Sequence, residues 1–197
     1  MIDIGVVILA GGEATRLPGK LALDADNVPL IVRVYGNVSP GRRTFVSCKE
    51  TFAPEIDALL PCPMVVDRWS LRGPLAGLIT TMSQMQTPYV FAVAGDAPFV
   101  DAAFIDRLAA EFRAGDQAIV PQHRVDNDTR IEPLAAVYDR IAFINTALPI
   151  LRSGKGALRM VIEKLATRYV NVQDDAVFAN VNTPQDYRHF QEAAHTA

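Results

Sequence analysis

Short apolar runs alternate along the chain with longer segments in which apolar residues recur at helical spacing. The apolar runs have the length of β-strands and cover residues 4–10, 44–48, 64–66, 89–94, 118–121, 134–138 and 169–172. The runs 4–10 and 89–94 are almost continuously apolar, which is typical of strands that are covered on both faces.

The segments between these runs predict helices at residues 28–37, 74–86, 101–114, 140–151, 157–166 and 184–194. Thr183 is a candidate N-cap for the last helix, and Asp186 stands three residues later, where a capping box has its acidic partner. Strands that alternate with helices indicate an α/β fold with a mainly parallel sheet and helices on both faces. The length of 197 residues favours a single domain over 1–197.

Composition narrows the class of function. The formal net charge is -3 and charged residues make up 21% of the chain, so no basic surplus favours nucleic-acid binding. The two cysteines form no C-x-x-C pair, which argues against a zinc site or a disulfide framework. The N-terminus lacks a basic segment before its apolar run, and no apolar run has the length of a membrane span. We therefore expect a cytoplasmic protein without membrane or nucleic-acid partners.

In open parallel sheets, ligands bind beyond the carboxyl ends of the strands. The first such loop reads LAGGEATRLPGK at residues 9–20. Gly11 and Gly12 allow backbone N–H groups to form an anion-binding concavity, and Arg16 and Lys20 add the cations that a triphosphate needs. The spacing of a Walker A loop is absent. The alternative is a plain glycine turn with two solvated cations.

Asp96 follows the apolar run 89–94, in the segment GDAPF. Mg²⁺ prefers carboxylate, phosphate and water oxygens, and one or two protein carboxylates are enough to hold it. Asp96 is therefore the candidate Mg²⁺ ligand. Its alternative role is that of a turn residue whose side chain stabilises the bend.

A third candidate segment follows residues 64–66. Asp67 comes directly after the run, and Gly73 and Pro74 precede a predicted helix that begins with the small residues Ala76 and Gly77. Small residues and the free N–H groups of a helix N-terminus can approach a flat ligand such as a base. Close helix packing explains Ala76 and Gly77 equally well, and a surface turn is the alternative for Asp67.

The polar stretch before residue 132 contains His123, Arg124 and Arg130. These side chains could hold an anionic acceptor, but a solvated loop is the favoured interpretation. No arrangement of serine, histidine and aspartate with suitable flanking residues supports hydrolysis by a nucleophilic triad.

Together these segments resemble the molybdenum cofactor guanylyltransferase family, within the wider group of sugar-phosphate-type nucleotidyltransferases. The matching motifs are LAGG-x-x-x-RL-x-x-K at 9–20, D-x(5)-GPLAGL at 67–78, V-x-GD-x-PF at 93–99, EPLAAVY at 132–138 and NTP-x-D at 182–186. The resemblance covers nearly the whole chain. Where the family often has asparagine after its second strand, this chain has Lys49.

The resemblance implies a three-layer α/β/α, Rossmann-like nucleotidyltransferase fold and Mg²⁺-dependent transfer of GMP from GTP to molybdopterin, with release of pyrophosphate. The implied partners are GTP, molybdopterin or Mo-molybdopterin, and other proteins of molybdenum cofactor biosynthesis. The segment around Asn182 would lie on the pterin side. The residues assigned to the nucleotide are Leu9, Ala10, Gly11, Gly12, Lys20, Asp67, Gly73, Pro74 and Asp96, and those assigned to catalysis are Arg16, Lys20 and Asp96.

Two alternatives stay open at this point. One is a related nucleotidyltransferase that uses CTP or a different phosphorylated acceptor. The other is a catalytically silent nucleotide-binding regulator on the same fold. We expect guanine to be preferred over cytosine, because backbone groups near residues 73–77 can reach the edge of a purine.

Overall fold

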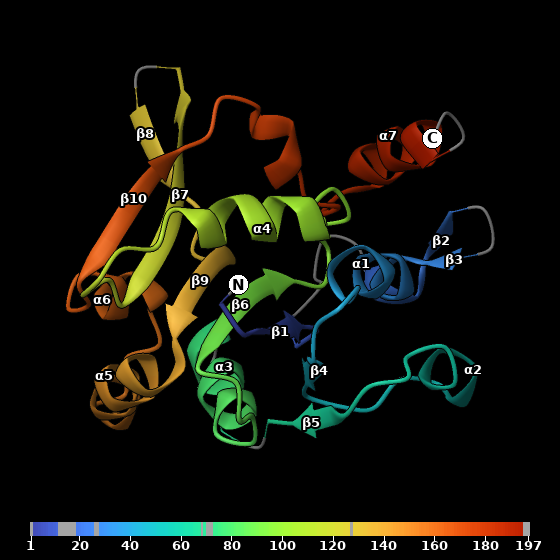
Figure 1. Ribbon diagram of the computed structural model, residues 1–197. Helices are drawn as coiled ribbons and strands as arrows, with labels where there is room; N and C mark the ends of the chain where they lie inside the picture. Colours follow the sequence, from blue (N-terminus) through green and yellow to red (C-terminus); the bar gives the residue numbers. More distant parts are fainter. Residues whose placement is uncertain are drawn as a thin grey trace.

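A mixed eight-stranded sheet forms the centre of the protein, as the ribbon diagram of the computed structural model shows (Figure 1). The structure describes residues 2–11, 19–25, 28–67, 69, 73–126 and 128–194. The strands of the sheet are β1 (Ile4–Leu9), β4 (Thr44–Cys48), β5 (Met64–Val66), β6 (Tyr89–Ala94), β7 (Ala118–Val125), β8 (Asp128–Ile131), β9 (Ala135–Asp139) and β10 (Thr167–Asn171). Their order is β10-β7-β9-β6-β1-β4-β5, with β8 paired to β7.

The helices are α1 (Leu30–Val38), α2 (Pro54–Asp57), α3 (Pro74–Met82), α4 (Ala102–Ala110), α5 (Arg140–Arg152), α6 (Leu158–Ile162) and α7 (Pro184–Ala194). Two short 3₁₀ helices, η1 (Lys20–Ala22) and η2 (Asp175–Phe178), lie in connections. Among the described residues, no helix is both long enough and apolar enough to cross a membrane.

Successive residues of β1 serve opposite faces of the sheet, as the two-residue period of a strand requires. Val7 packs into a cluster with α3, α5 and α6, whereas Val6 and Ile8 pack into a second cluster with α1 and α4. All three side chains are fully buried. The expected three-layer α/β/α arrangement and the burial of the first strand on both faces are confirmed.

The sheet is mainly parallel but not wholly so. β9 runs antiparallel to both of its neighbours, β6 and β7, and β8 runs antiparallel to β7. The remaining pairs, β1 with β4, β1 with β6, β4 with β5 and β7 with β10, are parallel.

The interpretation of the polar stretch before residue 132 as a loop is wrong. The strand expected at 118–121 continues to Val125 and pairs with β8, so that His123 lies opposite Arg130. His123 is buried, whereas Arg124 and Arg130 are exposed. The sequence did not predict this hairpin because β8 is polar and exposed along most of its length. The strand therefore lacks the alternation of apolar and polar residues that indicates a strand in a sequence.

The helix expected from residue 28 begins at Leu30 instead. Residues 28 and 29 form β3 (Val28–Pro29), which pairs with β2 (Asp24–Ala25) in a separate two-stranded sheet. Pro29 is the N-cap residue with extended backbone angles, φ -54° and ψ 143°. Several other helices are shorter than expected, since α3 ends at Met82 and α4 at Ala110, whereas α7 has the expected bounds.

The capping box expected at the start of α7 is confirmed. The Thr183 Oγ1 accepts a hydrogen bond from the Asp186 N–H at 3.2 Å, and Asp186 Oδ2 accepts from the Thr183 N–H at 2.8 Å. The same oxygen accepts from the Asn182 N–H at 2.9 Å. The Asn182 bond is the main reason that the pKa of the Asp186 carboxyl lies below its ordinary value.

We predict that Asp186→Ala lowers the free energy of unfolding by about 1 kcal/mol at neutral pH, the typical value of a helix cap. Because the pKa is lowered in the folded state, the stabilisation is complete above the ordinary pKa of about 4. It is lost as the pH falls through the lower folded-state pKa. Urea unfolding at neutral pH and near pH 3 measures both effects.

The control for this prediction is Asp3→Ala, which removes an exposed aspartate near the N-terminus. It should leave the unfolding midpoint nearly unchanged. A difference between parent and Asp186→Ala that stays constant down to acid pH would contradict the charge contribution of the cap.

Candidate active site

The candidate site lies where β1, β4 and β6 end. Leu9, the last residue of β1, pairs with Ser47 on one side and with Ala94 on the other. Beyond this row the Ala10 N–H donates to the Ser47 carbonyl at 2.7 Å, and the Gly95 N–H donates to the Leu9 carbonyl at 2.9 Å. The pairing therefore brings the three following turns to the same edge of the sheet.

Glycine is required at one of these turns by close approach. A Cβ atom at Gly95 would lie 3.1 Å from the Leu9 carbonyl oxygen and 3.1 Å from Ile31 Cδ1. Gly11 lies against Lys49, since its Cβ would be 3.3 Å from the Lys49 Cγ. Gly12 and Arg16, assigned to the nucleotide and to catalysis, lie outside the described residues. Lys20 is the first residue of η1.

Asp96 follows the turn after β6 and is partly buried. Its backbone carbonyl accepts a hydrogen bond from the Val181 N–H at 2.9 Å, which ties this turn to the segment before α7. The turn is held a second time where the Asn37 side chain donates to the Pro98 carbonyl at 2.7 Å. The Asp96 carboxylate therefore extends from a backbone that is fixed on both sides.

The described residues contain no group of three or more histidine, cysteine, aspartate or glutamate side chains that could hold a metal. Mg²⁺ keeps several waters and needs only one or two carboxylates beside phosphate oxygens. Asp96 is the residue suited to such a site.

Asp67 is not a residue of a surface turn, because only 5% of it is exposed. Its Oδ2 accepts from the Lys49 ammonium at 2.8 Å, and its Oδ1 accepts from the Trp69 N–H at 2.9 Å. The same ammonium donates to the Trp69 carbonyl at 2.7 Å. Lys49 is 41% exposed in its side chain, so the cation covers the buried carboxylate.

The start of α3 lies beside this pair. Gly73 is exposed and has a φ of 104°, a conformation that favours glycine, and Pro74 follows at the first helical position. Ala76 and Gly77 are buried, and a Cβ at Gly77 would lie 2.7 Å from Ser47 Oγ. Of the two roles considered for Ala76 and Gly77, close helix packing is therefore the one that the structure supports.

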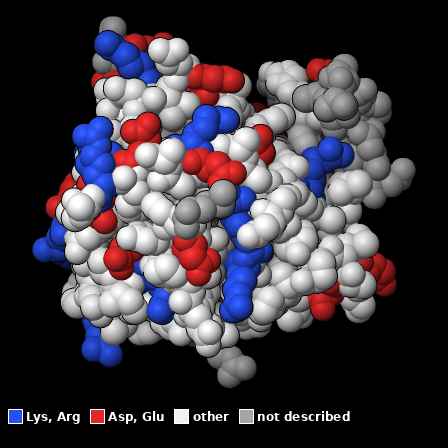
Figure 2. Space-filling model, in the orientation of Figure 1, with Lys and Arg blue, Asp and Glu red and all other residues white. Residues whose placement is uncertain are grey.

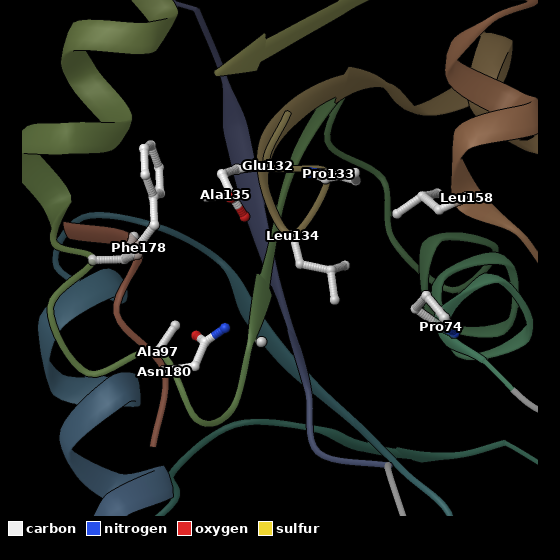
Figure 3. A pocket seen from close by; sticks show the side chains of 11 residues that line it. Pro74, Ala97, Glu132, Pro133, Leu134, Ala135, Leu158, Phe178 and Asn180 are labelled. Carbon is white, nitrogen blue, oxygen red and sulfur yellow. The ribbon is translucent and has the colours of Figure 1, made fainter. Parts of the chain in front are cut away.

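A pocket of about 260 Å³ opens beside the Asp96 turn. Ala94 and Ala97, which flank the turn, both line it. Figure 3 shows Asn180 beside Ala97 on one side of the pocket, Leu158 and Pro74 on the opposite side, and Glu132 at its upper end. The edge of the sheet at which β1 and β6 end thus adjoins this pocket at the turn that contains Asp96.

The sequence reasoning did not assign Glu132 or Asn180 to the site. Asn180 is two residues before the NTP-x-D motif, and its position could have been found from that motif. Glu132 precedes a strand, whereas the rule for parallel sheets points to residues that follow strands. Its signal in the sequence is the EPLAAVY motif.

The charged side chains on the face shown in Figure 2 are interspersed, with Lys and Arg next to Asp and Glu.

We predict that Lys49→Ala lowers the free energy of unfolding by about 1–2 kcal/mol, because a buried carboxylate loses its cation. The matched control is Arg159→Ala, which breaks an ion pair with Glu163 whose side chains are 77% and 60% exposed. That change should cost less than about 0.5 kcal/mol. Urea unfolding of the two variants makes the comparison, and equal losses would show that the Asp67 carboxylate does not need Lys49.

The model of the MobA-like NTP transferase domain matches residues 6–172. A protein named "Probable molybdenum cofactor guanylyltransferase" from Natronomonas pharaonis is 29% identical over 201 residues, which cover 94% of this chain and 96% of that protein. The molybdenum cofactor guanylyltransferase of Ralstonia nicotianae is 28% identical over 200 residues, with 96% and 97% covered.

Among solved structures, the molybdopterin-guanine dinucleotide biosynthesis protein A of Archaeoglobus fulgidus has a TM-score of 0.82 at 23% identity. The match covers 98% of this chain and all of that one. A synthetase for CMP-2-keto-3-deoxy-manno-octonic acid has a TM-score of 0.75 at 14% identity, which again supports the fold. The family model covers most of the chain, and the chain therefore belongs to the MobA-like NTP transferase domain family, whose members are nucleotidyltransferases.

Proposed function

We propose that this protein transfers GMP from GTP to molybdopterin, or to its molybdenum-loaded form, and releases pyrophosphate. The observation that carries the proposal is the place of Asp96, between the strand ends that would hold the nucleotide and the pocket lined by Glu132 and Asn180. The similar proteins that carry the name molybdenum cofactor guanylyltransferase support the choice of substrates.

The reaction is an in-line attack of the terminal phosphate oxygen of the acceptor on the α-phosphorus of GTP. The new bond joins that oxygen to the α-phosphorus, while the bond to the β-phosphate bridging oxygen breaks and pyrophosphate leaves with the electron pair. A phosphate nucleophile is already anionic at neutral pH and needs no general base. The protein therefore acts by positioning the two substrates and by neutralising charge.

Four groups of this chain share that work. The Gly11 and Gly12 backbone would hold phosphate oxygens, and Arg16 and Lys20 would stabilise the charge on departing pyrophosphate. Leu9 ends β1 and Ala10 follows it, and both would lie beside the nucleotide. Asp96 would hold Mg²⁺, which when bound neutralises phosphate charge.

The base would lie near the start of α3, beside Gly73 and Pro74. Asp67 is buried beneath Lys49, whose side chain is 41% exposed. The Lys49 ammonium is therefore the group of this pair that a ligand would contact. A lysine donates well to the O6 and N7 acceptors of guanine. In this chain we therefore assign Asp67 an indirect role: it holds Lys49, and Lys49 contacts the base.

We also propose a cytoplasmic location. Cys48 and Cys62 are free thiols, as proteins of a reducing compartment commonly have, and GTP is available there.

The proposal is tested by a panel of nucleoside triphosphates and acceptors, followed by pyrophosphate release and product analysis. We expect a dinucleotide form of molybdopterin from GTP, with CTP slower by at least about 10²-fold in kcat/KM, since a mismatched base strands polar groups of the site. A preference for CTP would overturn the guanylyl assignment. Transfer to hexose 1-phosphates but not to molybdopterin would overturn the acceptor.

We predict that Asp96→Asn lowers Mg²⁺-dependent turnover by at least about 10²-fold, the scale of losing one preorganised electrostatic group. The amide keeps the shape of the side chain, so a loss of turnover reports the loss of its negative charge. Turnover is measured by pyrophosphate release over a range of Mg²⁺ concentrations.

The matched control is Asp106→Asn, which neutralises an aspartate whose side chain is 57% exposed on α4. It should turn over at the parent rate. If Asp96→Asn also turns over at nearly the parent rate, Asp96 is not the metal ligand.

A further inference from the structure

The pocket beside Asp96 is nearly apolar. Among the described residues that line it, only Glu132 and Asn180 have polar side chains. A volume of about 260 Å³ is near the lower limit for ligand pockets and suits a flat heterocycle better than an extended molecule. The two polar side chains therefore determine which heterocycle the pocket can recognise.

The backbone around Glu132 is fixed by the strands that flank it. The Glu132 N–H donates to the Pro121 carbonyl of β7 at 2.9 Å, and the Glu132 carbonyl accepts from the Ala135 N–H at 3.1 Å. The turn also carries Pro133, whose carbonyl accepts from the buried Tyr138 hydroxyl at 2.8 Å. The side chain of Glu132 thus starts from a well-defined position.

A buried histidine fixes the carboxylate itself. His123 Nε2 lies 2.9 Å from Glu132 Oε1, and the histidine is 9% exposed. The ring packs against Phe178 with centroids 5.0 Å apart. Nδ1 has no hydrogen-bond partner among the described residues and lies 3.6 Å from Asp175 Oδ2. Among the described residues, the hydrogen-bond partner of the His123 ring is therefore Glu132. The side chain of Glu132 is 28% exposed.

We propose that Glu132, oriented by His123, selects the acceptor by pairing with two adjacent N–H donors on the edge of its heterocycle. This inference rests on the proposed function, because the 2-amino group and N3–H of a pterin form such an edge. A carboxylate has about four lone-pair sites, and His123 occupies one. Those remaining can accept both donors side by side, as they do from a guanidinium group.

Glu132 is thus a specificity-determining residue, and His123 is a positioning residue that acts through it. The location of the carboxylate in an apolar pocket strengthens the discrimination, because a ligand without the two donors leaves the carboxylate desolvated and unpaired. Asn180, which lines the same pocket, can supply a further polar contact.

The test compares two competitive inhibitors that differ at one position: a 6-substituted pterin and the matching lumazine, which has a carbonyl in place of the 2-amino group. For the parent we expect the pterin to inhibit transfer to molybdopterin about 10- to 100-fold more strongly than the lumazine, the scale of one charged hydrogen bond. In Glu132→Gln this ratio should fall to near one, and the KM for molybdopterin should rise about 10- to 100-fold. The KM for GTP should not change.

Two further variants distinguish a positioning role of His123 from a general loss of structure. His123→Ala should lose most of the pterin preference, and His123→Gln, which keeps a donor toward Glu132, should restore part of it. Glu163→Gln is the matched control, because it neutralises a glutamate on the neighbouring surface that is 60% exposed and paired with Arg159. The control should keep the parent ratio.

Failure of the inference can be told from failure of the proposed function. If the parent does not transfer GMP to molybdopterin, the proposed function is wrong. If the parent does so and Glu132→Gln keeps the parent ratio of pterin to lumazine inhibition, the inference is wrong. It is also wrong if Glu132→Gln raises the KM values for GTP and molybdopterin equally, since that pattern indicates a structural role.

Discussion

The parallel pairing of β1 with β4 and β6 is the interaction on which the candidate site depends. Because Leu9 pairs with both Ser47 and Ala94, the segments that follow the three strands begin at the same edge of the sheet. The strand is buried on both faces, so the backbone ladder satisfies its polar groups while its side chains join two separate clusters. A shift of β1 would move the nucleotide loop relative to Asp96.

A second backbone contact joins the end of the chain to this edge. The Val181 N–H donates to the Asp96 carbonyl, and the Thr183–Asp186 capping box fixes the start of α7 two residues later. Asn180 thereby comes to the pocket although it is distant from Asp96 in sequence. The segment that precedes α7 therefore connects the turn of Asp96 with the pocket that Asn180 lines.

The sequence predicted most of the features that follow from local patterns. The apolar runs at 4–10 and 89–94 indicated buried strands, and Thr183 with Asp186 indicated a capping box. A strand pattern and a capping box can each be recognised from residues that are close together in the sequence. The hairpin of β7 and β8 was not predictable in this way, since Arg124 and Arg130 are exposed and the pairing is made by the backbone. Nor did the pattern show that Lys49 bonds to Asp67, because that contact joins the ends of two adjacent strands.

The direction of β9 explains why Glu132 was not predicted from the rule that ligand-binding residues follow strands. In a parallel sheet, ligand-binding residues follow the strands, because all carboxyl ends lie at one edge. β9 runs the other way between β6 and β7, and its first residue Ala135 pairs with Val93 near the end of β6. The residues that precede β9 therefore lie at the ligand edge. For the same reason Glu132 meets His123, which lies toward the end of β7, next to the position where β8 pairs back onto that strand. An antiparallel strand within a mainly parallel sheet thus brings the turn that precedes it to the edge where the neighbouring strands end. The pocket forms where this turn meets the turns that follow those strands.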